Sequence, residues 1–184
     1  RMKKPANKYY SLTKLFFVAL LCQPVALLAQ NYEWAKDIGS TLTDYGNSIA
    51  VNDSGHVYVV GSFSGTADFD PGAGAQNLTS AGNTDIFFAK YDSIGNYLWA
   101  KRIGSASEDI GLSIAVDASG NCYITGLFND TVDFDPGAPT VNLTSVGFND
   151  IFFAKYSASG NYLWAKSIGS TGIDAGSNIA IDAS

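Results

Sequence analysis

Histidine, cysteine and methionine are nearly absent from this chain of 184 residues, which contains one, two and one of them respectively. With His56 as the single histidine, neither a histidine-rich metal site nor a Ser-His-Asp or Cys-His catalytic set can be assembled. Two cysteines provide at most one disulfide, so a hydrophobic core has to hold the fold together. Cys122 lies in an apolar run, and we interpret it as a small buried hydrophobe.

The 3.6-residue periodicity of an amphipathic helix is also missing from the sequence. Short runs rich in β-branched and aromatic residues alternate instead with turn signals such as Ser54-Gly55 and Gly95-Asn96. This pattern predicts an all-β protein.

Residues 1–30 contain no acidic residue and differ from everything that follows. They carry five positive charges and an apolar run over 15–21, which is the order of regions in a secretory signal peptide. We predict a signal peptide over residues 1–29, with cleavage between Ala29 and Gln30; a retained membrane anchor is the alternative. Lipidation at Cys22 is disfavoured, because Leu21 stands where a lipobox requires a small residue.

The charge balance changes once this segment is removed. Five of the eleven basic residues would be lost and six would remain against seventeen acidic ones, a formal net charge of −11. Such a charge makes nucleic acid an unsuitable partner. We expect no membrane span after cleavage and a secreted or cell-surface location.

A unit of 65 residues is repeated along the rest of the chain. Trp34, Trp99 and Trp164 each open the same phrase, Trp-Ala-Lys-x-Ile-Gly-Ser. Repeat 1 (34–98) and repeat 2 (99–163) align without a gap and share about 40 identical residues, and 164–184 begins a third copy. One repeat rarely buries its apolar surface alone, so stability has to come from stacked neighbours. We expect residues 30–184 to be a fragment of a larger repeat protein.

Each repeat contains four main predicted strands and one inserted arm. In repeat 1 the first three strands cover 48–51, 56–63 and 85–91, and the Tyr-Leu-Trp-Ala-Lys run is the fourth. The arm holds a short strand closed by Asp-Pro-Gly, where Pro71 and Gly72 suit a type II turn. The Asn-Leu-Thr-Ser phrase after this turn is expected to be looser.

Burial of both sheet faces distinguishes the possible architectures. Apolar side chains occupy odd and even positions alike in 57–60 and 86–89, so both faces of the sheet have to be covered. A propeller blade lies between two neighbours and meets this requirement, whereas a sandwich sheet has one polar face. We predict about two four-stranded β-propeller blades with partial flanking strands; a β-sandwich and a parallel β-helix are the alternatives.

Residues 113–137 (SIAVDASGNCYITGLFNDTVDFDPG) followed by 150–166 (DIFFAKYSASGNYLWAK) resemble the SBBP family, the bacterial seven-bladed β-propeller repeats. The resemblance covers nearly all of 31–184. It implies an exported bacterial protein, secreted or at the cell surface, often ending in a C-terminal sorting domain. The family has no general catalytic activity to carry over.

Paired aspartates in the arm are the best candidates for metal binding. Asp68 and Asp70 recur as Asp133 and Asp135, and residues two apart on a strand point to the same side. Calcium takes several oxygen ligands, and such a pair with a following glycine turn could supply some of them. The alternative is that these are solvated acids that shape the Asp-Pro-Gly turn. Asp44, Asp109 and Asp174 are interpreted as turn residues that bond the nearby backbone.

The repeat pattern favours a non-enzymatic, exported binding or scaffold module with no cofactor, whose partner is a protein or a polysaccharide. Repetition multiplies one shallow surface, which suits large or multivalent partners better than a unique reaction centre. One alternative is part of an extracellular polysaccharide-acting hydrolase or lyase whose catalytic residues lie elsewhere. The other is a structural stalk or adhesin segment.

Overall fold

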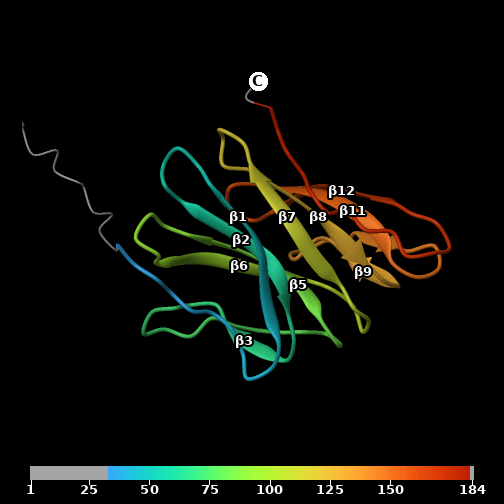
Figure 1. The fold of residues 1–184 in the computed structure, drawn as a ribbon, viewed down its shortest axis with the longest axis horizontal. Coiled ribbons are helices and arrows are strands. Elements are labelled where there is room, and N and C mark those ends of the chain that lie inside the picture. Colours follow the sequence, from blue (N-terminus) through green and yellow to red (C-terminus); the bar gives the residue numbers. More distant parts are fainter. Residues whose placement is uncertain (1–32, 183–184) are drawn as a thin grey trace, which may run out of the picture. The chain divides into compact units, whose positions relative to one another are not determined.

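The computed structural model describes residues 33–182, which form twelve strands and no helix. The first four-stranded antiparallel sheet has the order β1-β2-β5-β6. Its members are β1 (Asp44–Val51), β2 (Val57–Phe63), β5 (Asp85–Tyr91) and β6 (Tyr97–Ile103). Figure 1 shows this sheet in blue to green.

The second sheet repeats the first with the order β7-β8-β11-β12. It consists of β7 (Ile110–Val116), β8 (Cys122–Phe128), β11 (Asp150–Tyr156) and β12 (Tyr162–Ile168), drawn in yellow to red in Figure 1. Each sheet includes the Trp phrase that opens the following sequence repeat, because Trp99 lies in β6 and Trp164 in β12. The sequence repeat and the sheet are therefore out of phase by one strand.

Two short hairpins form the arms. They pair β3 (Thr66–Asp68) with β4 (Asn77–Thr79), and β9 (Thr131–Asp133) with β10 (Asn142–Thr144). The expectation that the Asn-Leu-Thr phrase is loose was wrong, since these residues are β4 and β10. Their cross-strand pairs include a hydroxyl contact of 2.8 Å between Thr66 and Thr79, which helps to fix the register.

A five-residue turn closes each long hairpin. In the β5–β6 turn, Asp92 Oδ1 accepts hydrogen bonds from the backbone N–H groups of Ile94 and Asn96, and Gly95 takes a φ of 79°. Asp117 and Gly120 repeat this geometry between β7 and β8. A side-chain acceptor at the first position and a glycine at the fourth account for the recurring turn sequence.

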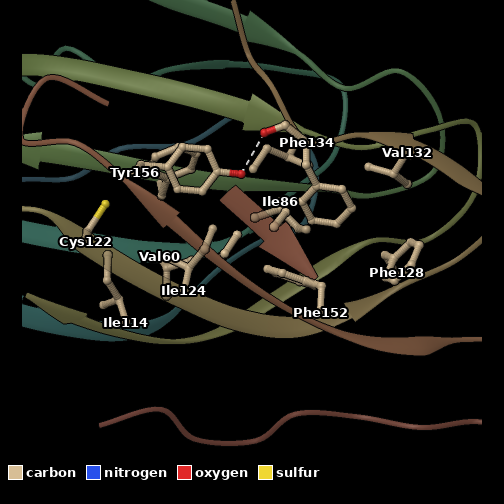
Figure 2. Packing of buried hydrophobic residues seen from close by; sticks show 14 of the residues in the cluster. Val60, Ile86, Ile114, Cys122, Ile124, Phe128, Val132, Phe134, Phe152 and Tyr156 are labelled. Carbon is tan, nitrogen blue, oxygen red and sulfur yellow. Dashed lines mark hydrogen bonds between the residues drawn. The ribbon is translucent and has the colours of Figure 1, made fainter. Parts of the chain in front are cut away.

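One hydrophobic core lies between the two sheets. The first sheet contributes the even-numbered residues of β2 and β5, and the second sheet contributes residues of β7, β8 and β11 (Figure 2). The members include Tyr58, Val60, Ile86, Phe88, Ile114, Cys122, Ile124, Phe152 and Ala154. Four-stranded antiparallel sheets that pack face to face in sequence order are β-propeller blades. The prediction of an all-β propeller fold is confirmed.

A second core covers the other face of the first blade. The odd-numbered Phe87 and Ala89 pack there with Phe63 and Phe69, and Trp34 and Ile38 close the cluster from the segment before β1. Tyrosine hydroxyls anchor the arms in both blades: Tyr91 donates to the carbonyl of Phe69 at 3.0 Å, and Tyr156 to that of Phe134 at 2.8 Å (Figure 2). The prediction that both faces of the central strands are buried is confirmed.

The predicted signal peptide over residues 1–29 and its cleavage site at Ala29 and Gln30 lie outside the described residues. Within 33–182, no helix is both long and apolar enough to cross a membrane.

Candidate functional site

The arm aspartates shape the Asp-Pro-Gly turn. Asp68 Oδ1 accepts hydrogen bonds from the backbone N–H groups of Gln76 at 2.8 Å and Asp70 at 3.0 Å, and these bonds lower the pKa of Asp68. Asp70 Oδ1 in turn accepts from the N–H of Gly72 at 2.8 Å. The predicted type II turn was wrong, because Gly72 does not take the positive φ that this turn requires. An aspartate side chain supplies the turn bond instead.

Asp133 and Asp135 repeat the same three hydrogen bonds in the second arm, at 2.8 to 3.0 Å. Among residues 33–182, no group of three or more histidines, cysteines, aspartates or glutamates is arranged to hold a metal ion. The turn role thus accounts for one oxygen of each aspartate, and calcium binding stays a prediction.

Each arm faces the Trp phrase across a polar groove. The first groove, of 550 Å³, brings Asp68 and Asp70 opposite Asp37 and Asp44. The second groove, of 410 Å³, places Asp133 and Asp135 opposite basic residues, Lys101 and Arg102. The two grooves have the same shape-determining turn but opposite charge on one wall.

Tryptophan ties each unit to the next one. Trp34 Nε1 donates to the carbonyl of Ser93 at 3.1 Å, and Trp99 Nε1 donates to that of Ala158 at 3.2 Å. The Trp99 ring also meets Tyr58 and Phe88 edge to face, with centroids 6.2 and 5.6 Å apart. The Trp99 ring therefore packs on its own blade while its N–H bonds the next one, which supports a core role over sugar stacking.

A buried tyrosine and lysine complete the contact between blades, here called the first junction. Tyr58 Oη donates to the carbonyl of Gly120 at 3.0 Å, and Lys90 Nζ lies 5.0 Å from the Tyr58 ring centroid. Lys90 Nζ also donates to the carbonyl of Ala158 at 3.3 Å. A lysine that is mostly buried thus keeps hydrogen-bond and cation–π partners from both blades.

The first junction also holds two buried carboxylates. Asp85, at the start of β5, receives Arg102 Nη1 at 2.6 Å on Oδ2, which also accepts from the N–H of Ala81 at 2.9 Å. Asp109, just before β7, accepts from the N–H groups of Ser105 at 2.7 Å and Asn129 at 2.9 Å. Burial raises the pKa of Asp109 to about 6, with a smaller contribution from the charge of Asp85. The Arg102 guanidinium therefore compensates Asp85, whereas Asp109 is held by backbone N–H groups.

The second junction lies between the second blade and the segment 169–182. Asp150 replaces Asp85 there, and its Oδ2 accepts from the N–H of Val146 at 3.1 Å. Ser167 stands where the first junction has Arg102. Oδ1 of Asp150, like Oδ1 of Asp85, has no hydrogen-bond partner within residues 33–182, so the two carboxylates differ in the cation on Oδ2. Asp174 replaces Asp109 and accepts from the N–H of Ser170 at 2.7 Å. Among the residues that the structure describes, Asp150 therefore lacks the cation that Asp85 has.

The remaining sequence candidates lie where their local roles predict. Asp44 accepts from the N–H of Ser40 at 2.6 Å, so Asp44, Asp109 and Asp174 all bond nearby backbone as predicted. Cys122 is buried, and burial raises the pKa of its thiol to about 12, so the interpretation as a small hydrophobe is confirmed. The N–H of His56 closes the β1–β2 turn by donating to Asn52 Oδ1 at 3.0 Å.

Sequence reasoning missed the pair of Asp85 and Arg102. The available signal was an aspartate that recurs directly before four apolar residues, at 85 and 150, since a carboxylate in such a run needs a buried partner. The residue that would pair with it lies at position 102, which differs between the copies. Repeat comparison alone therefore pointed away from it.

Two known proteins resemble this chain, although no family model matches it. An uncharacterised WD repeat-containing protein of Acanthamoeba polyphaga mimivirus is 29% identical over 163 residues, covering 76% of this chain and 12% of that protein. The regulatory protein FlaEY of Caulobacter vibrioides is 28% identical over 155 residues, covering 82% of this chain and 16% of that protein. The chain thus spans less than a fifth of either relative. The WD repeat match agrees with the propeller blades, and the SBBP resemblance stays a prediction.

Proposed function

We propose that this chain is a non-enzymatic β-propeller module for binding or scaffolding, exported to the cell surface or beyond it. One observation carries the proposal: the recurring groups that could do chemistry already hold neighbouring units together. Tyr58, Lys90 and Asp85 are buried between blades, and Trp99 bonds across them. Side chains engaged in this way are removed from solvent and substrate.

The surface, by contrast, is where the repeats differ. The two grooves keep the same Asp-Pro-Gly turn, but position 37 is aspartate where position 102 is arginine. Variation of exposed groups on a constant framework is how repeat proteins present binding surfaces. The strongly acidic composition after residue 30 favours a protein or polysaccharide partner over nucleic acid.

The export part of the proposal rests on the predicted signal peptide over residues 1–29. The first blade buries its central strands β2 and β5 without a disulfide among the described residues.

Two measurements on the full chain test the proposal together. The protein should be found in the culture medium, or protease added to intact expressing cells should degrade it. A glycan array should show that the protein binds a polysaccharide, and a reducing-end assay should show that it does not cleave that polysaccharide. Release of new reducing ends from any retained polysaccharide would favour the hydrolase alternative. Protection inside intact cells would contradict export.

A further inference from the structure

The second junction differs from the first at three neighbouring surface positions. Val146, Phe148 and Ile173 occupy the places that Ala81, Asn83 and Glu108 hold at the first junction. Their exposed fractions are 57%, 64% and 74%. All three substitutions put a large apolar side chain on the surface of one junction. Exposed hydrophobic clusters of this kind generally mark interaction sites.

The first junction shows that packing of a following blade does not cover these positions. The second blade is fully in place there, and Ala81, Asn83 and Glu108 nevertheless remain exposed. A blade seated on the second junction in the same way would leave Val146, Phe148 and Ile173 accessible. The apolar side chains therefore do not belong to the stacking interface.

The three residues lie on two loops that touch. A side chain at Gly147 would collide with the backbone of Thr171, and the N–H of Asp174 donates to the carbonyl of Asn149 at 2.7 Å. Phe148 and Ile173 thus sit next to residues that are in direct contact. We call Val146, Phe148 and Ile173 the junction patch.

An uncompensated carboxylate lies directly beneath the junction patch. Asp150 is 2% exposed and is held by the N–H of Val146, which belongs to the patch. At the first junction Arg102 pairs with the fully buried Asp85 while its own side chain stays 35% exposed, so a guanidinium can reach this carboxylate from a partly exposed position. Serine at 167 carries no charge, so Asp150 has no cation from its own blade, and a buried carboxylate gains most from a guanidinium partner.

We propose that the second junction is a docking site for a protein segment that carries an arginine flanked by apolar side chains. The guanidinium pairs with Asp150 along the path that Arg102 takes to Asp85, and the flanking side chains pack on the junction patch. Exposed Asp130 and partly exposed Asp174 lie near the same loops and favour a basic segment. The inference rests on the proposed binding function and names the chemistry of its partner.

The test uses the full chain and a fluorescein-labelled hexapeptide in which one arginine is flanked by leucine and phenylalanine. Fluorescence anisotropy should show saturable binding to the native chain. Replacing the peptide arginine by citrulline should weaken binding at least tenfold, because citrulline keeps the shape of the side chain and loses the charge. Equal binding of both peptides would overturn the arginine pairing.

Two variants place the first junction's residue at the second junction, and a third variant at the first junction is the control. Ser167→Arg should supply the guanidinium from within the chain and weaken peptide binding at least tenfold, while raising the melting temperature. Phe148→Asn should weaken binding at least fivefold with an unchanged circular dichroism spectrum. Asn83→Asp, at the first junction, should leave peptide affinity unchanged.

Two results would overturn the proposal. One is the absence of peptide binding to the folded native chain up to millimolar concentration, and the other is binding that neither Ser167→Arg nor Phe148→Asn alters. The glycan-array and surface-localisation results would stand in either case, so failure of this site is distinguishable from failure of the binding function.

Discussion

The two junctions use the same framework and differ in how completely they are closed. At the first junction a whole blade covers Tyr58 and Phe88, which are fully buried. At the second junction the segment 169–182 covers the equivalent Tyr123 and Phe153 only in part. The comparison teaches that each blade has two apolar faces. How far each face is buried depends on the unit that packs against it.

The largest expected loss of stability comes from removing one aromatic ring, and comparing this loss at the two junctions tests the difference in burial. Phe88 stacks on Tyr156 with centroids 4.4 Å apart, and Phe88→Ala should lower the free energy of unfolding by about 3–5 kcal/mol. Phe153→Ala should cost about 2 kcal/mol, because its ring is already partly exposed. Urea denaturation followed by tryptophan fluorescence measures both. Equal losses would contradict the difference in burial.

The next effect concerns the guanidinium that only the first junction has. Arg102→Ser makes the first junction like the second and leaves buried Asp85 without its cation, so we expect a loss of about 3 kcal/mol in unfolding free energy. Adding Asp85→Asn should recover much of this loss, since the amide carries no charge. A double variant no more stable than Arg102→Ser, measured by urea denaturation, would show that the arginine acts only through packing.

A pH-dependent effect follows from the raised pKa of Asp109. Folding shifts this carboxyl from 3.8 to about 6, so the folded state binds the extra proton and gains stability as the pH falls from above 6 toward 4. Between pH 7 and pH 4.5 the native chain should gain about 2 kcal/mol relative to Asp109→Asn, which cannot titrate. Denaturation curves of both proteins at each pH provide the difference.

The pH range of this measurement has to stay above 4, because other carboxylates affect stability at lower pH. The pKa values of Asp68, Asp92 and Asp117 are lowered in the folded state, so their contribution to stability is lost as the pH falls below the unfolded value. These three groups oppose Asp109 only at lower pH. A native-minus-variant difference that falls toward pH 4.5 would mean that Asp109 is stabilised in its charged form.

The smallest expected effect is that of calcium on the melting temperature, and it should be the same for both blades. The arms share the same aspartate-held turn, and the described residues offer too few companion ligands at either one. Melting curves with chelator and with millimolar calcium should differ by less than about 1 °C. A large rise with calcium would show that Asp68, Asp70, Asp133 and Asp135 bind the ion.

Local pattern and composition predicted the architecture well, because the uninterrupted apolar runs of β2 and β5 indicate that both faces of these strands are buried. The position and role of Cys122 followed from the same pattern. The strands β4 and β10 were missed because a three-residue polar phrase carries almost no periodicity. The pairing of Asp85 with Arg102 was missed because it joins residues 17 positions apart across a sheet register. Such contacts are set by tertiary packing.

The one-strand offset between the sequence repeat and the blade has a consequence for how the protein can change length. The chain enters each blade at β1 or β7 and leaves it at β6 or β12, where the next Trp phrase has already begun. A 65-residue insertion or deletion at any point within the repeats therefore rebuilds every sheet and every tryptophan tie with the same residue spacing. Unequal recombination can alter the number of blades while keeping the backbone spacing of each interface.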